Sequence, residues 1–149
     1  MVIQGFLKVP DIPGASAYRG HEDEIEVYGV TFSMEVPLDP NSLARRRRAA
    51  LSMIMFKKHY DKASPYLKKA LFDNTPFDEV VFSAQRTTEG VGSDYLVVTL
   101  TRASVAKYEM QPAEDEPELF EEHVGLTFQT IKFNYENAHE VELTVSPTK

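Results

Sequence analysis

The sequence contains no cysteine and no tryptophan among its 149 residues. Without cysteine, the chain can form neither disulfide bonds nor thiolate metal sites. It also lacks an apolar run of about 20 residues, the length that a helix needs to cross a bilayer. The first eight residues show no basic region followed by an apolar one, so we expect no cleavable signal peptide. If such a protein leaves the cell, we expect a route that does not read an N-terminal signal.

Positive charge is scarce and unevenly distributed, and the formal net charge is −7. Residues 1–75 carry 11 Lys and Arg against 9 Asp and Glu, whereas residues 76–149 carry 5 against 14. Nucleic-acid binding requires a basic face toward the phosphates, so this balance argues against a nucleic-acid partner. It is compatible with a protein whose positive and negative ends meet in neighbouring copies.

Motifs for catalysis and cofactor binding are missing as well. No G-x-S-x-G nucleophile turn is present, and Gly90-Val91-Gly92 opens a predicted strand rather than a phosphate-binding helix. The histidines are scattered without metal-ligand spacing: His21, His59, His123 and His139. We therefore predict no enzyme activity, no cofactor and no metal. The stretch from His21 to Glu24 leaves two interpretations open, a solvated acidic turn or a metal site.

One short helix is well marked in a chain that otherwise has the pattern of strands. Ser64 is a good N-cap residue, and the fixed φ of Pro65 suits the first helical position. We predict a helix over about residues 65–73, ended by Asp73-Asn74 before Pro76. Its apolar side chains are expected to belong to the core, with a role in an interface as the alternative: Leu67, Leu71 and Phe72.

Strand patterns occupy most of the remaining chain. Apolar residues alternate or cluster at 6–9, 25–27, 79–85, 95–101, 124–128, 131–135 and 141–145. The pattern changes parity after Gly29 and near Thr130, which predicts a β-bulge at each place. Residues 79–85 and 95–101 are expected to pair as a hairpin, and residues 103–110 either extend its second strand or form another.

About eight strands with regular turn signals usually close into a barrel or fold as a sandwich. At 149 residues the chain is expected to be a single domain, residues 1–149. Residues 43–62 are ambiguous, because their composition favours helix while Ile54, Phe56 and Tyr60 share the parity of a strand. Propensity alone predicts a helix in this stretch.

The run Arg45-Arg46-Arg47-Arg48 is the strongest electrostatic feature. It has three interpretations: a solvated basic loop, a nucleic-acid or nuclear-localisation patch, or a surface that faces an acidic segment of a neighbouring subunit. We favour the third. The candidate acidic partners are Glu114, Asp115, Glu116, Glu118, Glu121 and Glu122. Asp61 and Lys62 are either a pair between subunits or local support for the start of the helix.

Several segments, in this order, resemble the haemolysin-coregulated protein (Hcp) family, which forms the tube of bacterial type VI secretion systems. The string Asp61-Lys62-Ala63-Ser64-Pro65 before the helix and the alternating residues from Glu122 to Tyr135 are its main elements. The other matching positions are Phe6-Leu7-Lys8, Gly14, Ser16, His21, Asp23, Ile25, Leu67, Tyr95-Leu96, Val98-Thr99-Leu100 and Ala103-Ser104-Val105. The resemblance also favours a strand, rather than a helix, up to about Tyr60.

The resemblance implies a mainly β, single-domain, two-sheet β-barrel with the helix packed on its side. It implies hexameric rings that stack into a tube, which a contractile sheath propels behind a tip spike from a baseplate. It further implies effectors carried in the ring lumen, a cytoplasmic location before firing and an extracellular one after it, with no direct membrane insertion.

Two departures from the family pattern are visible. Residues 37–48 carry four arginines where the family often has glycine, which affects loop-dependent stacking of rings. Val30 or Phe32, and Phe133, stand where tryptophan is frequent, which should alter packing only. A monomeric β-barrel that holds a small ligand is the alternative function.

Overall fold

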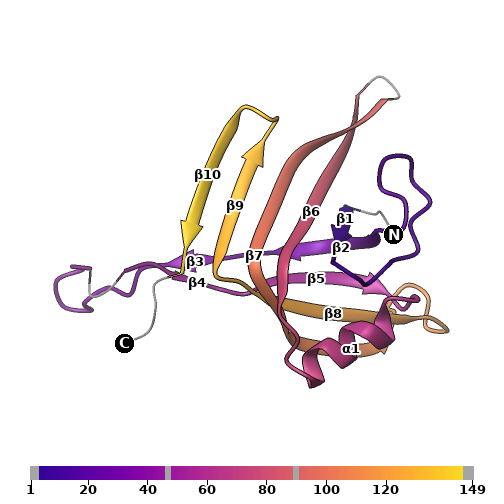
Figure 1. The fold of residues 1–149 in the computed structure, drawn as a ribbon. Coiled ribbons are helices and arrows are strands. Elements are labelled where there is room, and N and C mark those ends of the chain that lie inside the picture. Colours follow the sequence, from indigo (N-terminus) through magenta and orange to yellow (C-terminus); the bar gives the residue numbers. More distant parts are fainter. Residues whose placement is uncertain (1–3, 46–47, 89–90, 146–149) are drawn as a thin grey trace.

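The computed structural model describes residues 4–45, 48–88 and 91–145, and these form ten strands and one helix (Figure 1). The helix is α1 (Ser64–Phe72). The strands are β1 (Gly5–Lys8), β2 (Ile25–Thr31), β3 (Met34–Glu35), β4 (Ala50–Leu51), β5 (Ile54–His59), β6 (Phe77–Thr88), β7 (Val91–Pro112), β8 (Phe120–Thr127), β9 (Thr130–Tyr135) and β10 (His139–Thr144).

Six strands close a barrel in the order β7-β6-β1-β2-β5-β8, with β8 returning to β7. The barrel has two layers, because β1, β6 and the first part of β7 form one sheet with β9 and β10, while β5, β8 and the end of β7 form the other. All of these pairs are antiparallel. The predicted two-sheet β-barrel is confirmed, with more strands than the eight expected.

Strand β7 joins the two layers by turning a corner in its middle. Arg102 has a φ of 51°, in the left-handed region, and the strand changes partners there. Thr101 pairs with Thr130 of β9, whereas Ser104 pairs with Thr127 of β8. The parity change near Thr130 is therefore a break between β8 and β9 at the barrel corner, and the predicted bulge at that position is wrong.

The predicted bulge at Gly29 is confirmed. The residue has a φ of 56°, and the register between β2 and β5 shifts between Tyr28 and Thr31. Glycine suits this position for a second reason, since an added Cβ would lie 2.8 Å from the side chain of Lys57. The bend lets β2 pair with β1 at its start and with β5 at its end.

Residues 54–59 form strand β5, so the strand favoured by the resemblance is confirmed and the helix predicted from propensity is wrong. Ile54, Phe56 and Lys58 point inward, and each is at most 2% exposed. Burial on one face of a sheet outweighs the weak preference of Met and Lys for helix. Among the described residues of the preceding segment, only Ala50 and Leu51 form a strand, β4, which pairs with β3 as a short separate hairpin.

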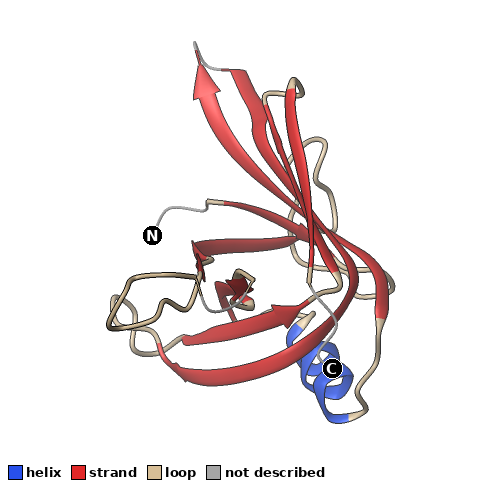
Figure 2. Cartoon of the chain, turned by 90° about the vertical axis from the view of Figure 1, so that its left-hand side faces the viewer, coloured by secondary structure: helices blue, strands red, loops and turns tan. Residues whose placement is uncertain are grey.

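The barrel interior is filled by apolar side chains. Those of Leu7, Ile25, Phe56, Leu100 and Leu126 are all at most 2% exposed. Helix α1 closes one side of the barrel and packs against β7 (Figure 2). It begins one residue before the predicted start and ends one residue before the predicted end.

Part of the sheet projects beyond the barrel. The ends of β6 and β7 that are joined by their hairpin, together with β9 and β10, rise above the closed strands in Figures 1 and 2. We call this part the extension. It leaves β10 as the last strand of the sheet order.

Candidate interaction interface

A buried charge cluster lies under the start of α1. The Lys58 ammonium donates to Glu122 Oε1 at 2.5 Å, to Asp61 Oδ1 at 2.9 Å and to Ser64 Oγ at 3.0 Å. Lys58 and Glu122 are 1% and 0% exposed. Ser64 and Tyr108 donate their hydroxyls to the same Glu122 carboxylate. Burial, and then the hydrogen bond and charge of Glu122, raise the pKa of Tyr108.

This cluster corrects two predictions from the sequence. Ser64 is not the N-cap: Ala63 occupies that position without a side-chain cap, and the Ser64 hydroxyl instead accepts from the Asp61 backbone N–H at 2.9 Å. Glu122 was expected to face another subunit, but its carboxylate is fully buried and engaged within its own chain.

Asp61 and Lys62 have different surroundings. Asp61 accepts from Lys58 and from the Ala63 backbone N–H, so it supports the start of the helix locally. Lys62 is exposed, and its ammonium lies 3.9 Å from an Asp23 carboxylate oxygen. A role of Asp61 or Lys62 in contacts between subunits stays a prediction.

Glu121 is also engaged within the chain. Its carboxylate accepts from the Tyr28 hydroxyl at 2.5 Å and lies 3.0 Å from His123 Nε2. These two hydrogen bonds lower the pKa of Glu121. Burial, and then the hydrogen bond to Glu121, raise the pKa of Tyr28. Glu121 therefore offers less free charge to a neighbour than its sequence position suggested.

The acidic loop, residues 113–119 between β7 and β8, does expose its charges. Its ends are held together by the Ala113 backbone N–H, which donates to the Leu119 carbonyl at 2.8 Å. Between them lie the predicted interface residues Glu114, Asp115, Glu116 and Glu118, all exposed. This segment is the predicted acidic surface that the structure leaves open to a partner.

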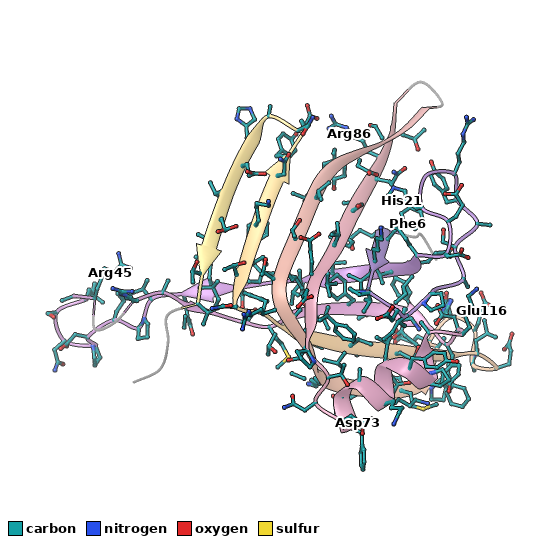
Figure 3. The ribbon with its side chains drawn as sticks, in the orientation of Figure 1. Phe6, His21, Arg45, Asp73, Arg86 and Glu116 are labelled. Atoms are coloured by element: carbon teal, nitrogen blue, oxygen red, sulfur yellow. The ribbon has the colours of Figure 1, made fainter. Side chains whose placement is uncertain are left out.

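The basic run lies on a loop between β3 and β4. Arg45 and Arg48 are exposed, while Arg46 and Arg47 lie outside the described residues. Arg45 and Glu116 lie at opposite ends of the molecule in Figure 3. Within one chain Arg45 and Glu116 therefore do not meet, and a contact between these two residues requires two molecules.

Three exposed apolar side chains were missed or misplaced by the sequence analysis. Phe72 was predicted to be core but is 87% exposed, because it lies five residues after the buried Leu67 and so points away from the barrel. Leu43 is 73% exposed and Val141 is 58% exposed. The spacing of five residues between Leu67 and Phe72 is the signal in the sequence that places Phe72 outside the core.

His21 is neither in a solvated turn nor in a metal site of the described residues. It is 7% exposed and stacks on Phe6 with ring centroids 4.5 Å apart. Its Nδ1 lies 2.9 Å from Glu24 Oε1, and its Nε2 lies 2.9 Å from Asp94 Oδ1. Burial alone would lower the pKa of His21, but the hydrogen bonds and charges of Glu24 and Asp94 outweigh it and raise the pKa above the usual value for histidine.

The described residues contain no group of three or more metal-ligating side chains placed to hold an ion. The same part of the chain contains no helix with the length and apolar character to span a membrane. The features that stand out are therefore surfaces: the acidic loop, the basic loop, the projecting extension and the exposed face of α1.

Comparison with known proteins gives a consistent match. Residues 6–135 match the family described as "Type VI secretion system effector, Hcp". The "Major exported protein" of Pseudomonas aeruginosa is 27% identical over 95 residues, which cover 64% of this chain and 55% of that protein. The chain thus matches about half the length of this curated relative.

Solved structures share the fold. An Hcp protein crystal structure has a TM-score of 0.86 at 20% identity, covering 97% of this chain and 100% of that one. A doubly mutated Hcp1 from the E. coli EAEC 042 pathovar has a TM-score of 0.83 at 23% identity, covering 96% and 99%. The secreted protein Hcp3 from Pseudomonas aeruginosa has a TM-score of 0.73 at 20% identity, covering 98% and 100%.

Proposed function

The chain belongs to the Hcp family of type VI secretion tube and effector proteins, and from this premise we propose that it is the repeating subunit of a secretion tube. Residues 1–149 act as one domain. Six copies close into a ring, and rings stack into the inner tube that a contractile sheath drives outward. The tip spike and the baseplate are the other structural partners.

An apolar strip on the extension supports contact between copies. The register places Val141 and Phe133 on the core-facing side of the sheet, beside Val98. There, Val141 is 58% and Tyr135 is 45% exposed. Contiguous exposed apolar surface on a soluble protein marks an interaction site. It lies next to an open edge, because β10 pairs only with β9 in the described part of the sheet.

The separation of charge supports stacking of rings. A ring requires heterologous contacts that close, and a tube requires a second, axial contact. Arg45 at one end and the acidic loop at the other provide opposite charges for a head-to-tail contact (Figure 3). Each exposed pair contributes only about 0–1 kcal/mol, but repetition around a ring sets orientation and salt sensitivity.

The alternative, a monomeric barrel that holds a ligand, has less support. A ligand-binding barrel needs an open interior, whereas this interior is occupied by buried side chains such as Phe56, Phe82 and Leu100. The rings of Phe56 and Phe82 lie 5.5 Å apart across it. A hollow for cargo would therefore be formed between copies and not inside one barrel.

The same proposal covers the path of the protein. As a structural subunit it has no catalytic role, carries effectors in the lumen of the ring, and is cytoplasmic until the tube is fired and released outside the cell. The exported relative from Pseudomonas aeruginosa supports the last step.

Negative-stain electron microscopy and native mass spectrometry of the purified chain test the proposal. We expect annular particles with six-fold symmetry and a native mass six times that of the chain. A compact monomer at high concentration, without annular particles, would contradict the tube function and favour the ligand-binding barrel.

A further inference from the structure

The loop between β3 and β4, which we call the basic loop, is held by backbone hydrogen bonds at its tip, residues 38–45. Leu38 and Arg45 form a β-bridge. The Leu43 backbone N–H donates to the Asp39 carbonyl at 2.7 Å, and the Asp39 N–H donates to the Ala44 carbonyl at 2.7 Å. These bonds fix a turn whose most prominent side chain is Leu43.

Leu43 is unfavourable in the isolated chain for two reasons. Its φ of 59° lies in the left-handed region, which residues with a Cβ rarely adopt. Its side chain is 73% exposed, so it gains little from burial. A strained residue that presents an apolar side chain to solvent at a built turn indicates a binding role.

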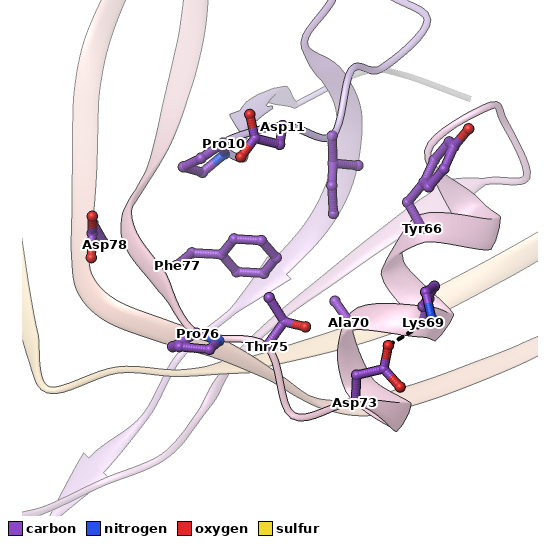
Figure 4. A pocket seen from close by; sticks show the side chains of 11 residues that line it. Pro10, Asp11, Tyr66, Lys69, Ala70, Asp73, Thr75, Pro76, Phe77 and Asp78 are labelled. Atoms are coloured by element: carbon purple, nitrogen blue, oxygen red, sulfur yellow. Dashed lines mark hydrogen bonds and ion pairs between the residues drawn. The ribbon is translucent and has the colours of Figure 1, made fainter.

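A groove beside α1 provides a matching surface (Figure 4). It has a volume of about 350 Å³ and lies between α1, the chain after β1 and the start of β6. Its floor is apolar and consists of Ile12, Ala70 and Phe77, each at most 7% exposed. Its volume is sufficient for a single aliphatic side chain.

The rim of this groove is acidic. Asp11, Asp73 and Asp78 surround the floor in Figure 4. Among the described residues that line it, the one lysine is Lys69, whose ammonium lies 2.7 Å from an Asp73 carboxylate oxygen. The carboxylates of Asp11 and Asp78 have no ion pair among the described residues, so the rim carries net negative charge.

We propose that the α1 groove of one copy is the receptor for the basic loop tip of a second copy. Leu43 enters between Ile12, Ala70 and Phe77, and the Arg45 side chain lies against Asp11 and Asp78. The inference rests on the proposed tube function and names the surfaces of its axial contact. In Figure 3, Arg45 lies far from Asp73, so one molecule cannot make this contact with itself.

The groove is a better receptor than the acidic loop that the sequence alone suggested. The acidic loop offers charge on a turn between two strands, whereas the groove offers charge together with a concave apolar floor. Burial of the Leu43 side chain requires the concave apolar floor, which the groove provides. In this arrangement the charges of Glu114 to Glu118 guide the approach of the basic loop, and the groove holds it.

The absence of cysteine allows a cross-linking test, because the introduced cysteines are then the only thiols in the chain. In the full chain, Leu43→Cys is combined with Thr75→Cys in the groove, and separately with Glu116→Cys in the acidic loop. Ring formation is checked first by electron microscopy. Both variants are then oxidised under mild conditions, and linked multimers are separated on a non-reducing gel.

We expect the Leu43→Cys/Thr75→Cys variant to form a ladder of multimers at least ten times faster than the Leu43→Cys/Glu116→Cys variant. Adding Asp11→Asn and Asp78→Asn should slow this linkage several-fold at low salt, with an unchanged denaturation midpoint. Faster linkage through Glu116→Cys, or rings without linkage at either site, would overturn the groove inference and leave the tube function intact. Absence of rings in the unsubstituted chain would overturn both.

Discussion

At the scale of single residues, the pair Lys58 and Glu122 shows how a charge is kept inside a β-barrel. A buried charge is tolerated when it is paired and its remaining hydrogen-bonding positions are satisfied. Glu122 accepts from Lys58, Ser64 and Tyr108, and Lys58 also donates to Asp61. The cluster therefore connects β5, β7, β8 and the start of α1.

Replacement of one partner should be costly. Lys58→Met leaves the Glu122 carboxylate buried without its cation, so we expect a loss of about 3–5 kcal/mol in the free energy of unfolding. The double variant Lys58→Met/Glu122→Leu should recover part of this loss, because two apolar groups replace the pair, although the Ser64 and Tyr108 hydroxyls lose their acceptor. Urea denaturation of both variants gives the measurement.

The control for this pair is an exposed one. Lys107 lies 3.2 Å from Glu109, and both side chains are about half exposed. Lys107→Met should change the free energy of unfolding by at most about 1 kcal/mol. An equally small effect of Lys58→Met would mean that the buried pair does not stabilise the fold.

The sequence could not reveal this cluster, because no local pattern connects residues 58 and 122. Alternation in β8 placed Val124 and Leu126 correctly in the core, but Glu122 has the same parity and was assigned to the surface from its charge alone. Periodicity predicts which face a residue occupies; it does not identify the partner that makes a charge on that face tolerable.

At the scale of elements, His21 connects the chain between β1 and β2 to the start of β7. Both of its ring nitrogens face carboxylates, those of Glu24 and Asp94. A carboxylate only accepts, so each nitrogen that hydrogen-bonds to one must donate, and the imidazolium is the state that satisfies both carboxylates. The Gln85 side-chain amide of β6 donates to the same Asp94 carboxylate, so both strands of the hairpin take part in the contact.

This arrangement predicts a dependence of stability on pH. The pKa of His21 is raised in the folded chain, so its contribution is complete below about 6.5, the usual value for histidine. It is lost as the pH rises through the higher, folded-state value. We expect the midpoint of urea denaturation to fall as the pH rises through this range. In the His21→Gln variant this pH-dependent fall in stability should be absent. His139→Gln, at an exposed histidine of β10, should leave the profile unchanged, and an unaltered profile in His21→Gln would contradict the assignment.

The elements themselves were predictable to different degrees. The helix was placed within one residue at each end, because Pro65 and Asp73-Asn74 are strong boundary signals. The hairpin of β6 and β7 was also predicted, although both strands are longer. Strand β5 was not predictable from propensity, since burial against the core decides its conformation.

At the scale of the whole molecule, the shape is a filled barrel with a projecting sheet and charges of opposite sign at its ends (Figures 1 and 3). The sequence predicted the charge separation only as a difference between its two halves. It could not predict the apolar strip on the extension or the α1 groove, because both combine residues from distant segments. These surfaces become visible only when the register of the strands and the position of the helix are known.

The two faces of β10 offer a direct test of how copies meet. Val141 lies on the apolar face with Phe133, whereas Thr144 lies on the opposite face of the same strand. Val141→Glu should abolish rings, because association would bury the new carboxylate without a partner. Its unfolding midpoint as a monomer should stay close to that of the unsubstituted chain, since Val141 is already 58% exposed.

The matched control, Thr144→Glu, introduces the same charge on the other face and should leave the rings intact. Native mass spectrometry at several protein concentrations separates the two outcomes. Rings in both variants at equal concentration would exclude the apolar strip as the contact between neighbouring subunits. Because the strip and the α1 groove lie on different parts of the molecule, this result would leave the axial contact through Leu43 open to its own cross-linking test.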